Sequence, residues 1–597
     1  AAAARSGAAP PTEEAAARAR PAPALEAEAV RAADQDGQDS GLSFFEVQWQ
    51  PAVQNTEPLI EEGKRVLVLA EGDPELLREL AQELGGDHAC VTDLPEDPQE
   101  FSNYSKVLFV ASARVAVVDM LAGALRVLKR VVRMQLRLQR MRRAVPEVWL
   151  VVQHTQAARL EDLRGAEVPK HAGLWGFARC LRLERPGFMV GCLDAGPRER
   201  GVGDLLQVVR SVRTRQGDAV EVELVARDSA ERGPELHTAR LVEAAPPAAL
   251  SLPESFFAGE RSYLLSGGTG ALAVLSARWM ADHGAGHLAL LSRSGRPPQD
   301  ADSVFGQLTS LSGLQVLIRQ CDVEDAAGVA GCLQELRGSM PPVRGILHAA
   351  GRLNDHMFEY LEAEHLAPVL GPKVDGALNL HAASAELELD LFVMYSSVAA
   401  MVGSVGQANY AAACSFLDSF AQHRRAQGLA GLSVQWGPWA SMGLSARSGI
   451  PQNRFVRTDP VSCLDALGAL LGGGAAPTSG IVGAARINWS GFFGRMKAVP
   501  SHLKNFERFK EEEERFKEKR GRGQIAARGA GVPGQARMLP LLSDFGRAGP
   551  GRGLGSLGSL SASPLLGLRP GFIPSRPAAG ATAGREEDSD SDSAESK

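Results

Sequence analysis

Residues 262–273 read SYLLSGGTGALA, which is an apolar strand, a glycine-rich turn and the first residues of a helix. Glycines at such a turn let backbone N–H groups approach a pyrophosphate, and the N-terminus of the following helix adds a favourable dipole. The pattern predicts the first strand–turn–helix unit of a dinucleotide-binding fold. Its expected cofactor contacts are Gly267, Gly268, Thr269, Gly270 and Leu272.

A second apolar strand, residues 287–291, ends in Ser292 and Arg293. A site for NAD places an acidic residue at this position, where it binds the ribose 2′-hydroxyl, whereas a serine and an arginine suit a 2′-phosphate. The sequence therefore predicts NADPH as the cofactor, with Ser292 and Arg293 at its phosphate.

Two hydroxyl-bearing residues further along the chain suit the reduction of a carbonyl group. Ser397 ends an apolar run that reads as a buried parallel strand, and Tyr410 begins a helical pattern. A ketone that accepts hydride develops alkoxide character on its oxygen, so it needs a positioned hydroxyl and a proton donor. We assign these two roles to Ser397 and Tyr410.

A phenol with a pKa near ~10 needs a nearby cation to exchange its proton near neutrality. In the common short-chain reductases this cation is a lysine four residues after the tyrosine, a position that is Cys414 here. The substitute is Lys373, in the block GPKVDG. The relocated lysine, this block and the segment VQWGPWA at residues 434–440 resemble the ketoreductase domains of modular polyketide synthases and, more distantly, those of animal-type fatty acid synthases.

The resemblance implies further cofactor contacts. It places the adenine-contacting turn at Asp322 and Val323. It also implies that the loop after the fourth strand faces the cofactor through Ala349, Ala350 and Gly351.

The resemblance also implies a reaction, the reduction of a β-ketoacyl thioester on an acyl carrier protein to the β-hydroxyacyl thioester. Tyr410 would donate the proton, Ser397 would hydrogen-bond the carbonyl oxygen, and Lys373 would lower the phenol pKa and hold the cofactor ribose. The implied partners are the carrier protein and other synthase components. In the family an asparagine often stands where this chain has Cys414, so its absence puts a water-mediated proton relay in question.

A stereochemical outcome is implied as well. The family is sorted by a Leu-Asp-Asp motif, associated with a D-hydroxyl, and by a tryptophan eight residues before the tyrosine, associated with the L outcome. This chain has Leu353-Asn354-Asp355 at the motif and Val402 at the tryptophan position. We expect a D-hydroxyl, (3R) for an unsubstituted chain, with Asp355 and Gln407 orienting the substrate.

The first half of the chain predicts the same alternation of strands and helices without binding chemistry. A strand over residues 65–70 leads into the turn AEGDP, whose two carboxylates would repel a pyrophosphate. The expected fold class is α/β with two Rossmann-like parallel-sheet subdomains. Residues 42–250 would form the truncated, structural one and residues 255–497 the NADPH-binding, catalytic one.

The flanking segments carry weaker patterns. Residues 1–41 and the low-complexity residues 521–597 are predicted to be disordered from their composition. Residues 500–520 predict a highly charged helix with a thin apolar stripe. A solvated linker helix is favoured there over a docking helix. The stripe consists of Leu503, Phe506, Phe509 and Phe516.

Composition narrows the setting. The formal net charge of -6 gives no reason to expect nucleic acid as a partner, and no apolar run reaches the ~18 residues of a membrane span. The seven cysteines lack metal-ligand spacing, so we expect no metal and a reducing compartment, cytoplasm or plastid. Because the sequence begins with Ala1, a targeting segment cannot be read from it.

Three alternatives stay open at this point. The chain could be an inactive reductase-shaped scaffold, a ketoreductase of the fatty acid synthase type, or an extended short-chain dehydrogenase acting on nucleotide sugars. The missing lysine after Tyr410 weighs against the last. No acyltransferase, ketosynthase or carrier motif occurs in the sequence, so we expect either a free-standing reductase or a fragment of a longer synthase.

Overall fold

The computed structural model describes residues 41–517 apart from a set of short segments. These segments are 53–56, 62, 86–87, 197–200, 217–218, 230–232, 247–251, 254, 258, 298, 441–442, 444–453, 473–478, 495 and 497. The disorder predicted for the two ends of the chain therefore falls, Gly41 apart, outside the described residues.

Seven parallel strands form the part of the sheet that follows residue 260, which we call the second lobe. Their order in space is β14-β13-β12-β15-β16-β17-β19. The order reverses between β12 and β15, which is the switch point at which open α/β sheets bind ligands. The strands are β12 (Ser262–Ser266), β13 (His287–Ser292), β14 (Gln315–Gln320), β15 (Val343–His348), β16 (Leu391–Ser397), β17 (Leu432–Trp436) and β19 (Ile481–Ile487).

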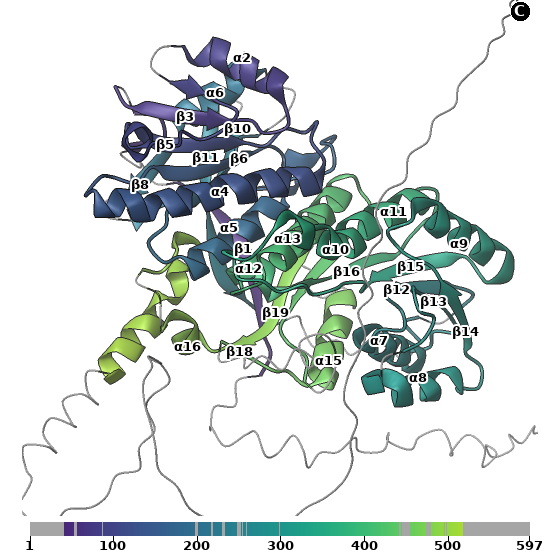
Figure 1. The fold of residues 1–597 in the computed structure, drawn as a ribbon. Helices are drawn as coiled ribbons and strands as arrows, with labels where there is room; N and C mark the ends of the chain where they lie inside the picture. Colours follow the sequence, from purple (N-terminus) through teal and green to yellow (C-terminus); the bar gives the residue numbers. More distant parts are fainter. Residues whose placement is uncertain are drawn as a thin grey trace, which may run out of the picture. The chain divides into compact units, whose positions relative to one another are not determined.

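Helices cover both faces of this lobe, as Figure 1 shows. One face packs α7 (Ala271–Asp282), α8 (Asp302–Thr309) and α15 (Pro460–Leu471) against the strands. The other packs α9 (Ala326–Ser339), α11 (Gly376–Ala383) and α13 (Ala408–Ala426). Because both faces are covered, the inner strands are largely buried and apolar, which is why they read as hydrophobic runs. The edge strand β14 is only partly buried.

The first lobe, residues 57–244, has its own parallel strands in the order β10-β7-β6-β5-β3-β4. They are β3 (Arg65–Leu69), β4 (Ala89–Cys90), β5 (Tyr104–Val110), β6 (Glu147–Val152), β7 (Val190–Asp194) and β10 (Glu223–Ser229). Its helices are α2 (Pro74–Leu84), α4 (Val117–Arg140), α5 (Gly173–Glu184) and α6 (Val202–Ser211). The α/β class is confirmed.

The two lobes share one continuous sheet, which the sequence did not indicate. Strand β1 (Ser43–Pro51) pairs antiparallel with β11 (Gly233–Ala244) of the first lobe and, through its first residues, with β19 of the second. Strand β11 in turn pairs with β10. The two parallel parts of the sheet therefore meet at the antiparallel strands β1 and β11. The boundaries 42–250 and 255–497 remain a prediction.

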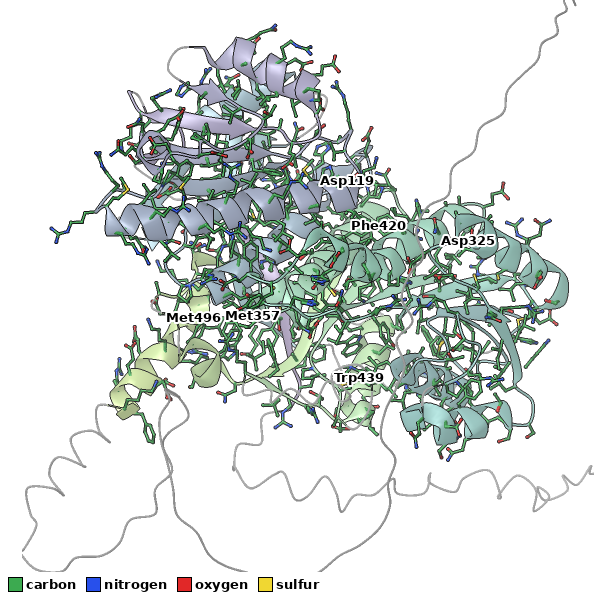
Figure 2. The ribbon with its side chains drawn as sticks, viewed as in Figure 1. Asp119, Asp325, Met357, Phe420, Trp439 and Met496 are labelled. Atoms are coloured by element: carbon green, nitrogen blue, oxygen red, sulfur yellow. The ribbon has the colours of Figure 1, made fainter. Side chains whose placement is uncertain are left out.

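Helices α5 and α13 pack closely across the lobes, and small residues make this possible. A Cβ on Gly176 would overlap the carbonyl oxygen of Ala411, and one on Gly173 would lie 3.0 Å from the carbonyl oxygen of Ala412. The helix that carries Tyr410 thus rests directly on the first lobe. Figure 2 shows how side chains fill the space between helices and sheet, with the buried Phe420 of α13 among them.

The segment after residue 500 corrects the prediction of a solvated linker. The 3₁₀ turn η6 (Ser501–Phe506) buries Leu503 and Phe506 in a cluster with Phe45 and Trp489. Only Phe516, at the far end of the stripe, is largely exposed. The sequence predicted one continuous charged helix for all four apolar positions. Leu503 and Phe506 instead lie in the 3₁₀ turn, which packs against the core. No helix among the described residues is long and apolar enough to cross a membrane.

Candidate active site

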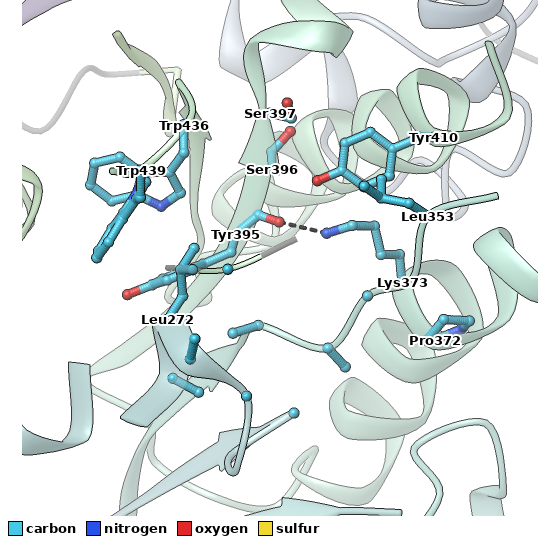
Figure 3. Close-up of a pocket in the computed structure, with 18 of the residues that line it drawn as sticks. Leu272, Leu353, Pro372, Lys373, Tyr395, Ser396, Ser397, Tyr410, Trp436 and Trp439 are labelled. Atoms are coloured by element: carbon cyan, nitrogen blue, oxygen red, sulfur yellow. Dashed lines mark hydrogen bonds between the residues drawn. The ribbon is translucent and has the colours of Figure 1, made fainter. Parts of the chain in front are cut away.

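A cavity of about 860 Å³ opens at the carboxyl ends of β12, β15, β16 and β17 (Figure 3). It lies at the reversal of strand order. Nearly all the residues predicted as cofactor contacts line it: Gly267, Thr269, Gly270, Leu272, Ser292, Arg293, Asp322, Val323, Ala349, Ala350, Gly351 and Lys373. The exception is Gly268.

The glycine-rich turn has the close approaches that its composition suggested. Gly267 has a φ of +63°, and a Cβ there would lie 2.8 Å from the Cα of Ala350. Gly268 packs against β13, where a Cβ would lie 2.7 Å from the Cα of Leu290. Gly270 precedes α7 as its N-cap. The turn therefore presents bare backbone and a helix N-terminus to the cavity, which fits a pyrophosphate.

The end of β13 carries positive charge. Ser292 is buried and accepts a hydrogen bond from the backbone N–H of Gly295, while Arg293 is exposed at the cavity wall. Arg296, three residues further on, also lines the cavity and was not predicted. The turn after this strand thus places two arginine side chains at the wall of the cavity.

Lys373 lies in a π-helical turn, η5 (Gly371–Asp375), and only 3% of its side chain area is exposed. Its Nζ donates to the backbone carbonyl of Tyr395 at 2.7 Å and lies 5.5 Å from the centre of the Tyr410 ring. The buried His348 ring bonds to the backbone oxygen of Lys373 at 3.0 Å and to Ser266 at 2.6 Å. An ordered network therefore fixes both the backbone and the ammonium of the lysine.

Ser397 and Tyr410 meet in the cavity. Ser397 is the N-cap of α12 (Val398–Val402), and its Oγ accepts from the backbone N–H of Ala399 at 3.2 Å. The Ser397 hydroxyl lies near enough to the Tyr410 phenol to act on its pKa. Figure 3 shows the tyrosine ring above the Lys373 side chain, on the same wall of the cavity. Distant positions in the sequence are thus brought together as predicted.

The electrostatics differ from the expected lowering of the phenol pKa. Burial raises the pKa of Tyr410 well above its ordinary value, and the neighbouring Cys414 thiol raises it further, whereas the nearby Ser397 hydroxyl lowers it. The ammonium of Lys373 is bonded to the Tyr395 carbonyl rather than to the phenol. In this arrangement Tyr410 keeps its proton, which is the state that a proton donor requires.

Cys414 is fully buried one helical turn after Tyr410. Burial raises the pKa of its thiol to about 11, although the nearby charge of Lys373 lowers it. A protonated, enclosed thiol is a poor nucleophile. The position holds a small neutral side chain.

Another wall of the cavity includes Leu353, Asp355 and Gln407, the last two predicted to orient a substrate. Gln407 donates from Nε2 to Oδ2 of Asp355 at 3.0 Å, and burial raises the pKa of that carboxyl. Oδ1 of Asp355 is buried and has no hydrogen-bond partner within the described residues. Val402, by contrast, is buried in the core below the cavity and does not line it.

Two cavity residues were quoted in the sequence without a role. Trp436 ends β17 directly beside Ser397 in the parallel ladder, and Trp439 packs edge-to-face on it at 5.3 Å. In the part of the chain that the structure describes, neither indole nitrogen has a hydrogen-bond partner, although both are buried. The segment 434–440 contains the end of the buried strand β17, and this position at a strand end was the signal that could have assigned them.

The described ranges contain no group of three or more histidine, cysteine, aspartate or glutamate side chains that could hold a metal ion.

Comparisons with known proteins agree with this geometry. Residues 261–441 match the family model described as "KR domain". A stretch of 197 residues, 32% of the chain, is 45% identical to the phenolphthiocerol synthesis polyketide synthase type I Pks15/1 of Mycobacterium marinum and covers 9% of that protein. A putative inactive relative from Mycobacterium tuberculosis, Pks1, is 45% identical over 30% of the chain and is covered to 11%.

Longer matches and solved structures extend the likeness to both lobes. The pikromycin synthase component PikAIII of Streptomyces venezuelae is 35% identical over 54% of the chain, which covers 20% of it. A ketoreductase from the first module of phoslactomycin biosynthesis in Streptomyces sp. HK803 is 25% identical, with a TM-score of 0.62 over 78% of this chain and 99% of that one. The first ketoreductase of the tylosin synthase is 26% identical, with a TM-score of 0.57 over 76% and 96%. The chain spans about a tenth of the first curated relatives that it matches.

Proposed function

We propose that this chain, whose residues 261–441 form a ketoreductase (KR) domain of the polyketide synthase type, reduces a β-ketoacyl thioester with NADPH. Domains of this kind are oxidoreductases of the short-chain dehydrogenase type. The observation that carries the proposal is the meeting of Lys373, Ser397 and Tyr410 in one cavity with the glycine-rich turn.

The chain's own residues supply the proton and the contacts that hold the carbonyl oxygen, whereas the hydride comes from the cofactor. When bound, NADPH supplies that hydride to the carbonyl carbon of the substrate. Ser397 holds the carbonyl oxygen by a hydrogen bond, and Tyr410, which keeps its proton in the buried site, donates it to the oxygen as negative charge develops there. Lys373 fixes the end of β16 and holds positive charge near the phenol, which favours the proton's departure.

The preference for NADPH is part of the proposal. Ser292, Arg293 and Arg296 line the cavity at the end of β13, where an NAD site would have an acidic residue. Gly351 packs closely on Lys373, since a Cβ there would lie 3.1 Å from Cε of the lysine. These contacts support a 2′-phosphate at Arg293.

We further propose that the product is the D-hydroxyl, (3R) for an unsubstituted chain. Leu353, Asp355 and Gln407 form the wall of the cavity that would face the acyl chain. The partners proposed are an acyl carrier protein and other synthase components, as in the multidomain relatives. Because all seven cysteines are unpaired, we propose a reducing compartment, cytoplasm or plastid.

A second candidate is an inactive scaffold with the same fold. One similar protein, Pks1 of Mycobacterium tuberculosis, is itself described as putative inactive, and this observation supports the second candidate. Such a scaffold would bind NADPH without turnover. The two candidates differ in one measurement, the oxidation of NADPH by the purified chain with and without a β-ketoacyl N-acetylcysteamine thioester. Reduction predicts NADPH loss matched by β-hydroxy thioester, whereas binding without product would support the scaffold.

A further inference from the structure

The last residue of α5 in the first lobe, Glu184, holds two loops of the second lobe at once. Its Oε2 accepts from the backbone N–H of Phe358 at 2.6 Å, and its Oε1 accepts from the backbone N–H of Gly406 at 2.9 Å. Phe358 lies in the loop 349–366 after β15, which we call loop A. Gly406 lies in the segment 403–407 before α13, which we call loop B.

These two loops form the substrate side of the cavity. Loop A carries Leu353 and Asp355 into it, and loop B carries Val405 and Gln407. The loops also bond to each other, since the backbone N–H of His356 donates to the oxygen of Gly406 at 2.8 Å. Any change in their separation would therefore move the Gln407–Asp355 pair.

Helix α5 holds the chain around loop B at further points. Arg179 donates from Nη1 to the backbone oxygen of Ala400 at 2.6 Å, and the Cys180 sulfur accepts from the N–H of Ser404 at 3.3 Å. Gly403 has a φ of +83°, and a Cβ there would lie 2.8 Å from the carbonyl oxygen of Arg179. The approach is so close that the loop follows the helix surface.

Loop A is held by the same helix. The ring of Phe358 packs edge-to-face on Phe177 of α5, with 5.7 Å between the centroids. An exposed ion pair joins Arg185 to Glu359 at 2.7 Å. Only Glu184 has hydrogen bonds to both loops among these residues, and both go to backbone amides. Because both bonds go to backbone N–H groups, the carboxylate fixes the position of the main chain in both loops and does not depend on the loops' side chains.

We infer that Glu184 is a positioning residue for the reaction: from the first lobe, it sets the separation of loops A and B and so the face of the carbonyl that meets the hydride. The inference rests on the proposed function for its catalytic readout. It also gives the first lobe a specific part in selectivity. Misplacement of about 1 Å at a reacting centre can cost about 10²-fold in rate.

The test compares Glu184→Ala and Glu184→Gln with the control Arg185→Ala, which removes the exposed ion pair between the same helix and loop A. The readouts are kcat, KM, NADPH Kd, the D:L ratio of product from a β-ketoacyl N-acetylcysteamine thioester, and amide hydrogen exchange. For Glu184→Ala we expect kcat/KM to fall about 10- to 100-fold and the D:L ratio about tenfold, with NADPH Kd unchanged. Arg185→Ala should match the wild type, because exposed ion pairs contribute little.

Glu184→Gln keeps the shape but presents an NH₂ group to one of the two amides, so an intermediate loss is expected. It carries the test if Glu184→Ala fails to fold. An unchanged D:L ratio and unchanged kcat/KM in a folded variant would overturn the inference.

Hydrogen exchange separates this inference from the proposed function. If the wild type shows no turnover, the proposed function fails, while exchange at Phe358 and Gly406 still tests the positioning role. The inference requires both amides to exchange about tenfold faster or more in Glu184→Ala, with the strands of the second lobe unchanged. Equal exchange in variant and wild type would contradict it.

Discussion

Gln407 donates a hydrogen bond of 3.0 Å to Asp355, and this bond ties the segment before the catalytic helix to the loop after β15. Both residues line the cavity. The carboxyl of Asp355 is largely buried, and its second oxygen has no partner within the described residues. The pair is therefore a fixed feature of the cavity wall, and Oδ1 of Asp355 is an acceptor that a ligand could use.

The first prediction concerns this pair and stereochemistry. Removing the amide in Gln407→Ala should release Asp355 and lower the D:L ratio of the product. A preference of ~100:1 needs only about 2.7 kcal/mol between two transition states, so one lost hydrogen bond of ~1 kcal/mol can reduce it several-fold. Chiral chromatography of the product from an unsubstituted β-ketoacyl thioester measures both the wild-type outcome and the change. Predominantly L product from the wild type would refute the D assignment.

The second prediction concerns cofactor choice. Arg293→Ala should weaken NADPH binding by ~1.5–3 kcal/mol, the range of a charge-assisted hydrogen bond, with little effect on NADH. The control is Arg319→Ala, because Arg319 lies on the neighbouring strand, pairs with Glu335 and does not line the cavity. Fluorescence titration with the two cofactors gives the comparison. Equal losses for NADPH and NADH would show that Arg293 does not bind the phosphate.

A third prediction follows from the enclosed thiol of Cys414. Burial raises its pKa to about 11, so near neutral pH it stays a thiol and should resist iodoacetamide in the folded protein. Cys414→Ala should keep most of the activity. Peptide mapping after alkylation and steady-state rates of the variant test the two statements. Complete loss of activity in a folded Cys414→Ala variant would mean that the thiol takes part in proton transfer.

The fourth prediction is a pH dependence of stability. Burial, helped by the charge of Lys373, lowers the pKa of His348 to about 3, whereas the unfolded chain titrates near ~6.5. The unfolded state therefore binds the proton first as the pH falls. The stabilisation from the neutral ring is complete above about pH 6.5 and is lost toward pH 3, at about 1.4 kcal/mol per pH unit.

Replacing the ring in His348→Gln should flatten the dependence of unfolding free energy on pH by about that amount per unit. Denaturant titrations between about pH 6 and pH 4.5 give the slopes. His287→Gln, at the partly exposed first residue of β13, is the control. An unchanged slope in His348→Gln would contradict the assignment of a neutral buried ring.

Local patterns predicted most of the second lobe. The glycine-rich turn, the strand before Ser397 and the helix that begins near Tyr410 are each contained in a short stretch, so periodicity and turn chemistry were sufficient. Lys373 needed the family resemblance, because nothing local links it to a tyrosine 37 positions later in the sequence. The structure brings the two together through the turn η5.

Features that depend on pairing between residues far apart in the chain could not be predicted from the sequence. The β1–β11 seam joins residues separated by most of the first lobe, and such antiparallel pairing leaves no local signal. The same holds for Glu184, whose partners lie 174 and 222 positions away. Leu503 and Phe506 were misassigned because a helical stripe and a docked 3₁₀ turn share similar apolar spacing over so few residues.

The central claim is that this cavity reduces a carbonyl group with Tyr410 as the proton donor. The most direct measurement compares wild type and Tyr410→Phe with NADPH and a β-ketoacyl N-acetylcysteamine thioester, following β-hydroxy product by mass spectrometry and NADPH affinity by titration. We predict that the wild type forms product, and that the variant binds NADPH equally well but has a kcat lower by at least ~10². Product formation at the wild-type rate by Tyr410→Phe, or NADPH binding without product in the wild type, would contradict the claim.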